Sequence, residues 1–428
     1  MTLRVTREQL ADDHGRYHRQ ELMEWWDQAR VAAAKVLVIG AGALGNEILK
    51  LLGLIGVGHT VVYDPDRIER SNLSRCVLFR DHDEGRYKAE VAAERMRELN
   101  PDIEVVARTE NIVTQAGLGP FWWADVVVAG VDNREARVFV NAACARANRA
   151  WVDGAIEGLS GIARVFVPAE TACYECTMNR TDRKLLAERR SCALLARDVV
   201  ARGHVPTTAV AASLVAALQV QEAIKLLHGQ PTLRGEGIHV HGMWDDFSRV
   251  GYRRREDCLG HDDGGPAQGL GAGVADLTLD QLLSRAEHDF GPGAEIELSR
   301  ELVLSLSCPD CGTHSPGRAA LGAIREADAA CPACGAHRVV DTVSSIARDG
   351  RVDLGMTPAE LGVPPFDAVF PRCGMSAPRT WLFDGDAAAI VGATSGSIAT
   401  ATAAAAATDA APTSDLRSPA GSDKGSDS

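Results

Sequence analysis

A glycine-rich turn between an apolar run and a helical pattern constrains the fold of this chain more than any other feature. Four apolar residues, 36–39, lead into a Gly-x-Gly-x-x-Gly pattern at Gly40, Gly42 and Gly45, and apolar residues follow at helical spacing over 46–52. This order predicts a buried parallel strand, a tight turn and a helix whose first N–H groups face an anion. Gly40 would permit the turn, Gly42 would let a phosphate approach the backbone, and Gly45 would let the helix pack close to the strand.

A second predicted strand, 60–63, ends at Asp64, which is about where an acid that binds a ribose hydroxyl is expected. Chance glycines in an ordinary strand-turn-helix are the alternative, but the combination of strand, motif, helix, strand and acid favours a nucleotide site. Further strands are predicted at 103–107, 125–129, 150–152 and 163–167, with helices near 43–54, 86–99 and 134–148. This alternation predicts a doubly wound, Rossmann-like α/β fold with a mostly parallel sheet. A long apolar helix over 205–228 is expected to be buried or at a subunit interface.

With 428 residues, the chain is long enough for two or three domains. A shift to Gly and Asp predicts a linker at 263–273, between a first domain, 1–262, and a small domain, 274–388. The tail, 389–428, consists largely of Ala, Thr, Ser, Gly and Asp and is predicted to be disordered.

The net charge of -13 argues against a nucleic-acid-binding protein, because few phosphates could be neutralised. The first twenty residues carry charges throughout and have no apolar signal segment, so we expect a cytoplasmic protein. The uncharged stretch 387–408 has too few large apolar residues for a membrane span.

Six of the eleven cysteines fall in three Cys-x-x-Cys pairs, which indicates metal ligation in a reducing cytosol rather than disulfides. Cys308, Cys311, Cys331 and Cys334 belong to two Cys-Pro-x-Cys-Gly turns. Two such turns can close a tetrahedral site of four thiolates, so they predict a zinc ribbon in the small domain. Unligated thiols or a redox pair are the alternatives.

Five further motifs follow the glycine loop in the first domain. They are Asp64-Pro-Asp66, Ser71-Asn72-Leu73-Ser74-Arg75, Gly85-Arg86-Tyr87-Lys88, Asp132-Asn133-x-x-x-Arg137 and Cys173-x-x-Cys176. With these motifs, residues 10–262 resemble the ThiF/MoeB family of ubiquitin-like-protein-activating enzymes, which are adenylyltransferases. The resemblance implies an ATP- and Mg²⁺-dependent homodimer that adenylates the C-terminal carboxylate of a small ubiquitin-like (β-grasp) or sulfur-carrier protein.

The resemblance also implies roles for individual residues. The implied nucleotide-binding residues are Gly40, Gly42, Gly45, Asp64, Asp66, Asn72, Arg75, Lys88, Asp132 and Asn133. Asp132 would bind Mg²⁺, and Arg75, Lys88 and the partner subunit's copy of Arg19 would supply fixed positive charge. This fits the chemistry, because an ionised carboxylate needs no general base, and the reaction needs positioning and charge neutralisation. Cys76 departs from the family, where glutamine is frequent, and is interpreted as a small core residue.

Two more cysteine assignments rest on the resemblance. The family's second Cys-x-x-Cys is replaced here by Cys258-Leu-Gly-His261, so we predict a Cys₃His zinc site from Cys173, Cys176, Cys258 and His261. A lost site, or metal shared with a C-terminal turn, is the alternative. Cys192 follows two arginines and occupies the place of the nucleophile in thioester-forming relatives. A spare cysteine is the alternative, since some relatives stop at the adenylate.

Other functions remain open at this point. They are adenylation for sulfur transfer without a thioester, as in thiamine or molybdopterin synthesis, adenylation of a tRNA base or a peptide, and an inactive scaffold that binds a ubiquitin-like protein. The small domain has no cluster of titratable groups that suggests chemistry, and we expect it to recognise the substrate or a downstream carrier.

Overall fold

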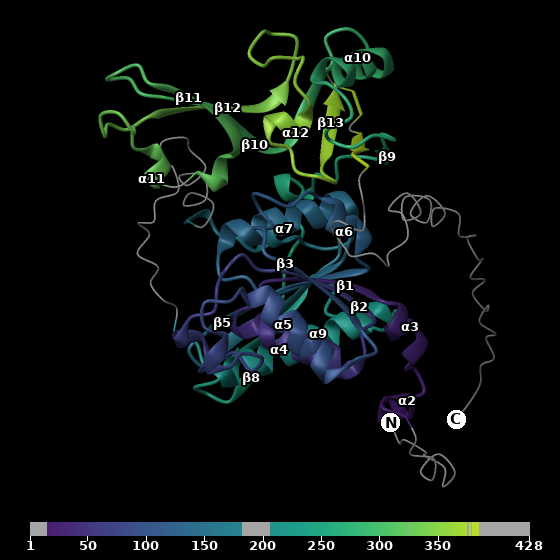
Figure 1. Cartoon of the computed structure of the whole chain (residues 1–428). Helices are drawn as coiled ribbons and strands as arrows, with labels where there is room; N and C mark the ends of the chain where they lie inside the picture. The colour runs from purple at the N-terminus through teal and green to yellow at the C-terminus, as the bar shows by residue number, and fades with distance from the viewer. Residues whose placement is uncertain (1–14, 182–205, 325, 375, 378, 385–428) are drawn as a thin grey trace, which may run out of the picture.

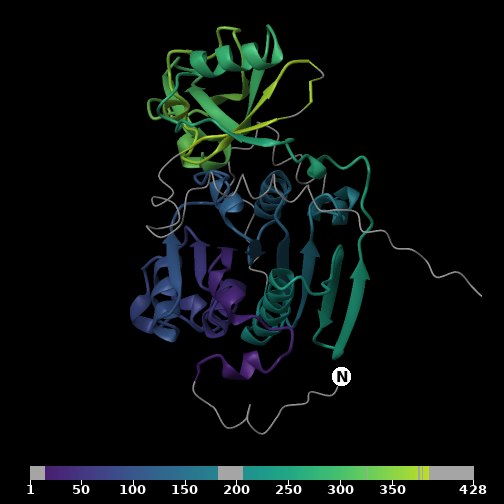
Figure 2. The same cartoon turned by 90° about the vertical axis from the view of Figure 1, so that its right-hand side faces the viewer.

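The computed structural model describes residues 15–181, 206–324, 326–374, 376–377 and 379–384. Cys192 and the predicted tail, 389–428, lie outside the described residues. Two sheets, each with its own helices, make up the described chain (Figures 1 and 2).

The first sheet has eight strands in the order β3-β2-β1-β4-β5-β6-β7-β8. These strands are β1 (Lys35–Ile39), β2 (His59–Tyr63), β3 (Glu104–Arg108), β4 (Val126–Ala129), β5 (Trp151–Glu157), β6 (Ser160–Phe166), β7 (Glu236–His241) and β8 (Asp246–Gly251). Strands β3 to β5 pair in parallel, whereas β5 to β8 pair antiparallel. The direction of winding reverses between β1 and β4, and ligands of such sheets bind at the carboxyl ends of the strands beside this reversal.

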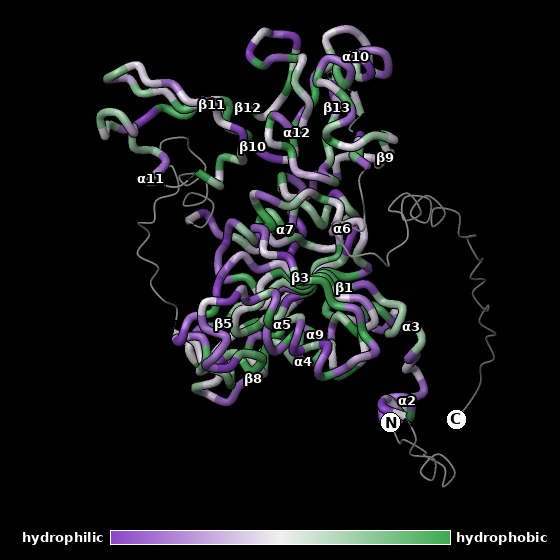
Figure 3. Tube along the Cα trace, viewed as in Figure 1, coloured by the Kyte–Doolittle hydropathy of each residue, from purple (hydrophilic) through white to green (hydrophobic). Residues whose placement is uncertain are grey.

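Two layers of helices cover the first sheet. Residues of α4 (Ala43–Ile55), α5 (Lys88–Leu99) and α9 (Ala209–Leu227) share one core with the sheet, and those of α6 (Gly119–Trp123) and α7 (Arg134–Ala147) share the other. The parallel strands are hydrophobic along their length because both of their faces are covered (Figure 3). The predicted strand-helix alternation and the doubly wound sheet are therefore confirmed.

The predicted long apolar helix is α9. By length and composition it could cross a membrane, but half of it is buried inside the protein, where it packs on the sheet with Val215, Ala216 and Val220. Short elements complete the first domain: α2 (His18–Glu21), α3 (Gln28–Ala33), η1 (Arg70–Asn72), η2 (Asp81–Asp83), η3 (Tyr174–Thr177) and η4 (Leu259–His261).

The second sheet has six strands, of which five follow the order β11-β10-β13-β14-β9 while β12 pairs with β10. Its strands are β9 (Ala267–Gly269), β10 (Glu295–Ser307), β11 (His314–Ala320), β12 (Val339–Ile346), β13 (Ala368–Arg372) and β14 (Thr380–Leu382). The accompanying helices are α10 (Leu279–Phe290), η5 (Leu321–Ala323), α11 (Glu326–Ala329) and α12 (Pro358–Leu361). The second half of β10 projects from the domain with β11 and β12, and we call residues 302–343 the ribbon arm (Figure 1).

The segment 263–273 is not a free linker as the sequence predicts, because it contributes a strand to the second sheet. β9 pairs in parallel with β14, and Leu270 belongs to the core of the second domain. The composition of this segment is rich in glycine, but backbone hydrogen bonds to a neighbouring strand do not require large side chains. The segment is part of the second domain's sheet.

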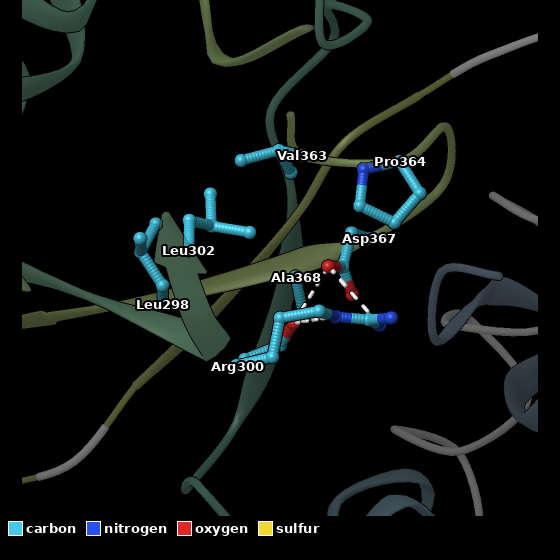
Figure 4. A pocket seen from close by; sticks show the side chains of 8 residues that line it. Leu298, Arg300, Leu302, Val363, Pro364, Asp367 and Ala368 are labelled. Atoms are coloured by element: carbon cyan, nitrogen blue, oxygen red, sulfur yellow. Dashed lines mark hydrogen bonds and ion pairs between the residues drawn. The ribbon is translucent and has the colours of Figure 1, made fainter. Parts of the chain in front are cut away.

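The second domain packs on α6 and α7, which lie between the two sheets (Figure 1). Gly119 N donates to Phe366 O at 2.8 Å, and an added Cβ at Gly119 would lie 2.5 Å from the Phe366 side chain, so the two backbones approach closely. The pocket of Figure 4 lies at this junction, and the ion pair between Arg300 and Asp367, with N and O 3.4 Å apart, lines it. Arg300 also donates to Val113 O and Ala116 O of the first domain. The junction is therefore held by apolar packing and by the hydrogen bonds that Arg300, oriented by its buried ion pair with Asp367, makes to the first domain.

Candidate nucleotide and metal sites

The glycine loop connects β1 to α4 at the carboxyl edge of the sheet. Gly40 has φ +95°, and an added Cβ there would lie 2.7 Å from Gly130 O, so only glycine fits. An added Cβ at Gly45 would lie 1.9 Å from Gly40 O, because the helix starts directly against the turn. At Gly42, the N-cap of α4, no atom lies within 4 Å of an added Cβ. The backbone at Gly42 is thus open to a ligand, and α4 directs its first N–H groups toward it.

Asp64 follows β2 and is held by the glycine loop. Its Oδ2 accepts a hydrogen bond from Ala41 N at 2.7 Å, and its Oδ1 accepts one from Asp66 N at 2.9 Å. Burial raises the pKa of this carboxyl, which is only 6% exposed, while Lys88 and the two backbone donors act in the opposite direction. Each oxygen keeps a lone pair that a ribose hydroxyl could use.

Lys88 is the first residue of α5 and points at the same acids. Its Nζ lies 2.8 Å from Asp66 Oδ2. Burial lowers the pKa of Lys88, but Asp64 and Asp66 outweigh this effect, and the net shift is upward. Lys88 therefore carries a fixed positive charge beside the open glycine loop. Burial raises the pKa of the nearby Cys76 thiol to about 11, although Arg75 and Lys88 lower it, so Cys76 stays a neutral core residue.

The segment that carries Asn72 and Arg75 is tied to the glycine loop by a residue that the sequence did not single out. Asn46 Nδ2 donates to Ala41 O at 2.6 Å, and Asn46 Oδ1 accepts from Leu78 N at 2.9 Å. Asn72 is buried, and Arg75 donates to Ser71 O at 2.7 Å from a half-buried position. Asn46 was missed because its position inside a helical pattern gives no motif signal.

Asp132 and Asn133 lie in the loop after β4, next to β1 at the reversal of the sheet. Asn133 caps α7 by accepting from Ala136 N at 2.8 Å, and its Nδ2 donates to Asp132 Oδ1 at 3.2 Å. The Asp132 carboxylate is exposed. The loops after β1, β2 and β4 thus bring Gly42, Asp64 and Asp132 to one edge of the sheet.

Arg19 lies at the opposite end of α4. It belongs to α2, and the preceding Tyr17 packs where α4 ends, with its ring 2.4 Å from an added Cβ at Gly56. Tyr17 Oη also accepts from Asn100 Nδ2 at 2.6 Å. Because α4 has 13 residues, its two ends are separated by about 20 Å. The structure therefore does not bring Arg19 to the glycine loop of its own chain.

The predicted Cys₃His residues come together between η3 and η4, and we call this group zinc site 1. Their ligand atoms all lie within 4.8 Å of one another. Cys173 Sγ is 3.8 Å from Cys176 Sγ and 3.7 Å from Cys258 Sγ, and Cys176 Sγ is 3.2 Å from His261 Nε2. Two thiolates bound tetrahedrally at about 2.3 Å from Zn²⁺ would be about 3.8 Å apart, so the donor set fits zinc.

The four cysteines of the ribbon arm also converge, and we call them zinc site 2. Cys308 Sγ is 3.5 Å from Cys334 Sγ, and Cys311 Sγ is 3.5 Å from Cys331 Sγ. Each turn closes with a hydrogen bond from a glycine N–H to the first cysteine's carbonyl oxygen, from Gly312 at 3.0 Å and from Gly335 at 2.8 Å. The spacing of these sulfurs fits a structural zinc ion.

A group of exposed apolar side chains lies at the same edge of the sheet as the glycine loop, on the far side of β5. It comprises Leu159, Val210, Leu214, Met243, Trp244 and Phe247, and we call it the apolar corner. The turn after β5 pairs with the start of α9 through Gly158 and Thr207, and an added Cβ at Gly242, after β7, would lie 2.9 Å from the Leu159 side chain. These six make up half of the large apolar side chains that are exposed within the described residues, and Trp244 is 77% exposed. A group of exposed apolar side chains of this kind is typical of interaction surfaces.

The sequence was compared with protein families and with known proteins. The ThiF family model matches residues 17–260. Sulfur carrier protein ThiS adenylyltransferase of Escherichia coli is 32% identical over 58% of this chain and 94% of its own length. SAMP-activating enzyme E1 of Haloferax volcanii is 34% identical over 62% of this chain and 93% of its own. Ubiquitin-like modifier-activating enzyme 5 of Arabidopsis thaliana is 31% identical, and the matched part spans about half of it, 48%.

Among solved structures, E. coli MccB with ATP is similar with a TM-score of 0.50 and 24% identity, over 60% of this chain and 77% of that one. This likeness supports the fold alone.

Proposed function

This chain belongs to the ThiF family, and we propose that it is an adenylyltransferase that acts on the C-terminal carboxylate of a small ubiquitin-like or sulfur-carrier protein. The observation that carries the proposal is the largely buried, charged Lys88, which lies near the open backbone of Gly42 and near Asp64, the carboxylate held by the glycine loop. Two relatives that are matched over more than nine-tenths of their length are named for the activation of such carrier proteins, which supports the substrate class.

In the proposed reaction, a carboxylate oxygen of the substrate attacks the α-phosphorus of ATP. A new oxygen–phosphorus bond forms, the bond from the α-phosphorus to the bridging oxygen breaks, and pyrophosphate leaves with its electron pair. No proton has to be removed from an ionised carboxylate. The chain's task is to hold two anions together, with Gly42 N–H and the charges of Lys88 and Arg75 offsetting their repulsion.

Asp132 is the proposed Mg²⁺ ligand, since an exposed carboxylate at the phosphate end of the site suits a hard cation. The ion would add positive charge at the phosphates. The proposed donor from a partner is Arg19, whose position far from the glycine loop of its own chain supports action in a homodimer. Zinc sites 1 and 2 are proposed to be structural.

The apolar corner is the proposed docking surface for the folded part of the substrate protein. It lies at the carboxyl edge of the sheet, as the glycine loop does, so a flexible tail from a protein bound there would have a path along β4 and β5 to the nucleotide. Whether the product is then captured on Cys192 as a thioester is the part of the proposal that distinguishes a modifier-activating enzyme from a sulfur-carrier adenylyltransferase.

The test is ATP–pyrophosphate exchange in the presence of purified small proteins that end in Gly-Gly. We expect exchange with the wild-type protein and a loss of about 100-fold or more with Lys88→Met, because one charge that stabilises the transition state is removed. Lys225→Met is the matched control, since Lys225 pairs with Glu222 on α9 and not with the site.

Tight binding of NAD in place of ATP, or full exchange by Lys88→Met, would refute the adenylyltransferase proposal. A non-reducing gel then compares wild type with Cys192→Ala. An adduct that thiols cleave, and that Cys192→Ala lacks, supports the thioester step. Exchange without any such adduct supports adenylation for sulfur transfer.

A further inference from the structure

One face of α7 carries a line of polar side chains that the proposed reaction does not use directly. Asn133, Arg137 and Asn141 follow one another at intervals of four residues, so they lie on the same side of the helix. Arg137 is 7% exposed and Asn141 is 2% exposed. Buried polar groups of this kind are stable only where they are fully hydrogen-bonded, so their partners indicate what they hold in place.

Arg137 holds the backbone on both sides of Asp132. Its Nη2 donates to Val131 O at 2.6 Å, and its Nη1 lies 3.5 Å from Asn133 O. The same Nη2 donates to Gly154 O of β5 at 2.9 Å. One guanidinium therefore ties the loop that presents Asp132 to the neighbouring strand of the sheet.

Arg137 is itself held in a single position by Asp153, which is fully buried. Asp153 Oδ1 accepts from Arg137 Nε at 2.8 Å, and its Oδ2 accepts from Arg164 Nε at 3.0 Å and also pairs with Arg164 Nη2. The Arg164 guanidinium lies over the ring of Tyr174, 5.1 Å from its centre. Because both oxygens of the carboxylate have charged donors, Asp153 cannot rotate without breaking an ion pair in the protein interior.

Asn141 connects the same helix to zinc site 1. Its Oδ1 accepts from Tyr174 N at 2.8 Å, and its Nδ2 donates to Gly260 O at 3.1 Å. Tyr174 lies between Cys173 and Cys176, and Gly260 lies between Cys258 and His261. One amide therefore contacts both halves of the zinc site.

We propose that Arg137 is a positioning residue for Asp132, and that zinc site 1 anchors the helix that carries Arg137. This inference rests on the proposed function, in which Asp132 binds Mg²⁺ beside ATP. Arg137 is assigned no direct role at the phosphates, because its Nε and Nη2 donors are engaged by Asp153, Val131 and Gly154. Without Arg137, the exposed loop around Asp132 would sample several positions, and the affinity for Mg²⁺ would fall. The affinity for ATP without Mg²⁺ would stay the same.

The test is calorimetric titration of ATP into the full-length, zinc-loaded protein over a range of Mg²⁺ concentrations and in EDTA. Mg²⁺ should increase the affinity for ATP, and we measure the Mg²⁺ concentration that gives half of this increase. We expect Arg137→Gln to raise that concentration by about tenfold, which is usual for groups that orient a metal ligand. The Kd for ATP in EDTA should match that of wild type. Arg149→Gln is the matched control, because Arg149 follows the same helix and donates to a backbone carbonyl, Trp122 O at 3.2 Å, away from Asp132.

A double-mutant cycle separates positioning from general stability. In the Asp132→Asn background, Arg137→Gln should produce no further change in the Mg²⁺ requirement, since its effect passes through Asp132. A further shift in that background, or an equal loss of ATP affinity in EDTA, would refute the inference alone. A wild-type protein whose ATP affinity does not respond to Mg²⁺ would refute the Mg²⁺ role of Asp132 in the proposed function as well.

Asn141→Ala tests whether zinc site 1 anchors α7. It also tests the inference in the event that Arg137→Gln does not fold. We expect it to release one zinc ion to a chelator about tenfold faster than wild type and to raise the Mg²⁺ requirement in the same direction as Arg137→Gln. Faster zinc release with an unchanged Mg²⁺ requirement would show that zinc site 1 does not anchor the Asp132 loop.

Discussion

The two cysteine clusters each join two short ligand segments, but the sequence separation between these segments is very different. In zinc site 1 the paired ligands, Cys173 with Cys258 and Cys176 with His261, are 85 residues apart. In zinc site 2 the pairs are 20 and 26 residues apart, and the ribbon arm has a small core of its own around Val303, Leu306 and Ile324. Site 1 lies against α7 and the main core through Tyr174 and Asn141, whereas Cys311 and Cys334 of site 2 are exposed.

This difference indicates what each metal would do. A metal in site 2 would organise the ribbon arm locally, since all four of its ligands belong to that arm. A metal in site 1 would hold the segment between its two pairs of ligands against the first domain. Through Asn141 it would also stabilise α7, the helix that follows the proposed Mg²⁺ ligand, Asp132. The same kind of ligand cluster would thus serve a local fold in one place and a long-range connection in the other.

Among the predicted changes in stability and zinc content, the removal of one ligand from each site should give the largest. We expect Cys258→Ser and Cys334→Ser each to lose one zinc ion per chain and to destabilise the surrounding region by on the order of 5 kcal/mol, a part of the free energy with which structural zinc binds. The Kd for ATP should rise only in Cys258→Ser, because Asn141 of α7 is hydrogen-bonded to the ligand segments of site 1 and not to those of site 2. Zinc content, thermal unfolding and ATP titration would check this. Equal effects of the two variants on ATP binding would contradict the distinction.

Glycines next to the last ligand of each site allow a finer comparison. At Gly260, an added Cβ would lie 2.9 Å from Asn141 Nδ2 and 2.8 Å from Glu175 Oε1, so Gly260→Ala should cost about 1–3 kcal/mol through overpacking. At Gly335, φ is +77° and no atom lies within 4 Å of an added Cβ, so Gly335→Ala should cost only the backbone penalty of about 1–2 kcal/mol.

Chemical denaturation of both glycine variants would measure these costs. The physical causes are separable, because in the Asn141→Ala background Gly260→Ala should lose part of its cost, whereas the cost of Gly335→Ala should stay the same. A Gly260→Ala protein as stable as wild type would show that the packing around site 1 is looser than this structure indicates.

The smallest expected effect concerns a hydroxyl beside site 2. Thr313 Oγ1 lies 3.1 Å from Cys311 Sγ, and a hydrogen bond from it would stabilise the thiolate. We expect Thr313→Val to release zinc about tenfold faster in a chelator assay, with the fold retained. Thr342→Val is the matched control, since Thr342 lies on the same arm and bonds Glu301 instead of a cysteine. Equal release rates in the two variants would exclude a role for the Thr313 hydroxyl.

Much of the first domain could be predicted because its signals are local. The apolar runs of the parallel strands are buried on both faces, so each run identifies a strand without knowledge of its neighbours. Glycine at position 45 is required by the approach of Gly40 O within the same turn, and glycine at position 40 is favoured locally by its φ of +95°. The contact of Gly40 with Gly130 O comes from a distant part of the chain. The grouping of Cys258 and His261 with Cys173 and Cys176 followed from the family motif, and the structure brings these four together.

Other features could not be predicted, because they depend on partners that are distant in the sequence. Asp153 ends a short apolar run and gives no motif signal, yet it organises Arg137 and Arg164. Arg300 and Asp367 are 67 residues apart and pair within the second domain, and both bond to the backbone of residues 113–118 in the first domain. The glycine-rich composition of 263–273 predicts a linker and not the strand β9, because the pairing of β9 depends on β14, more than 100 residues away.

The sequence by itself determined the first six strands of the large sheet, the glycine loop and the grouping of the four cysteines of zinc site 2, because apolar runs and short spacings along the chain specify these features. The residues of the proposed nucleotide site and the ligands of zinc site 1 were identified through the family motifs. Only the tertiary structure decided that Arg19 lies far from the glycine loop of its own chain, that the second domain packs on α6 and α7, and that α7 runs from zinc site 1 to Asp132. These features depend on which surfaces pack against each other. That is decided by the packing of the whole chain and cannot be read from any one segment.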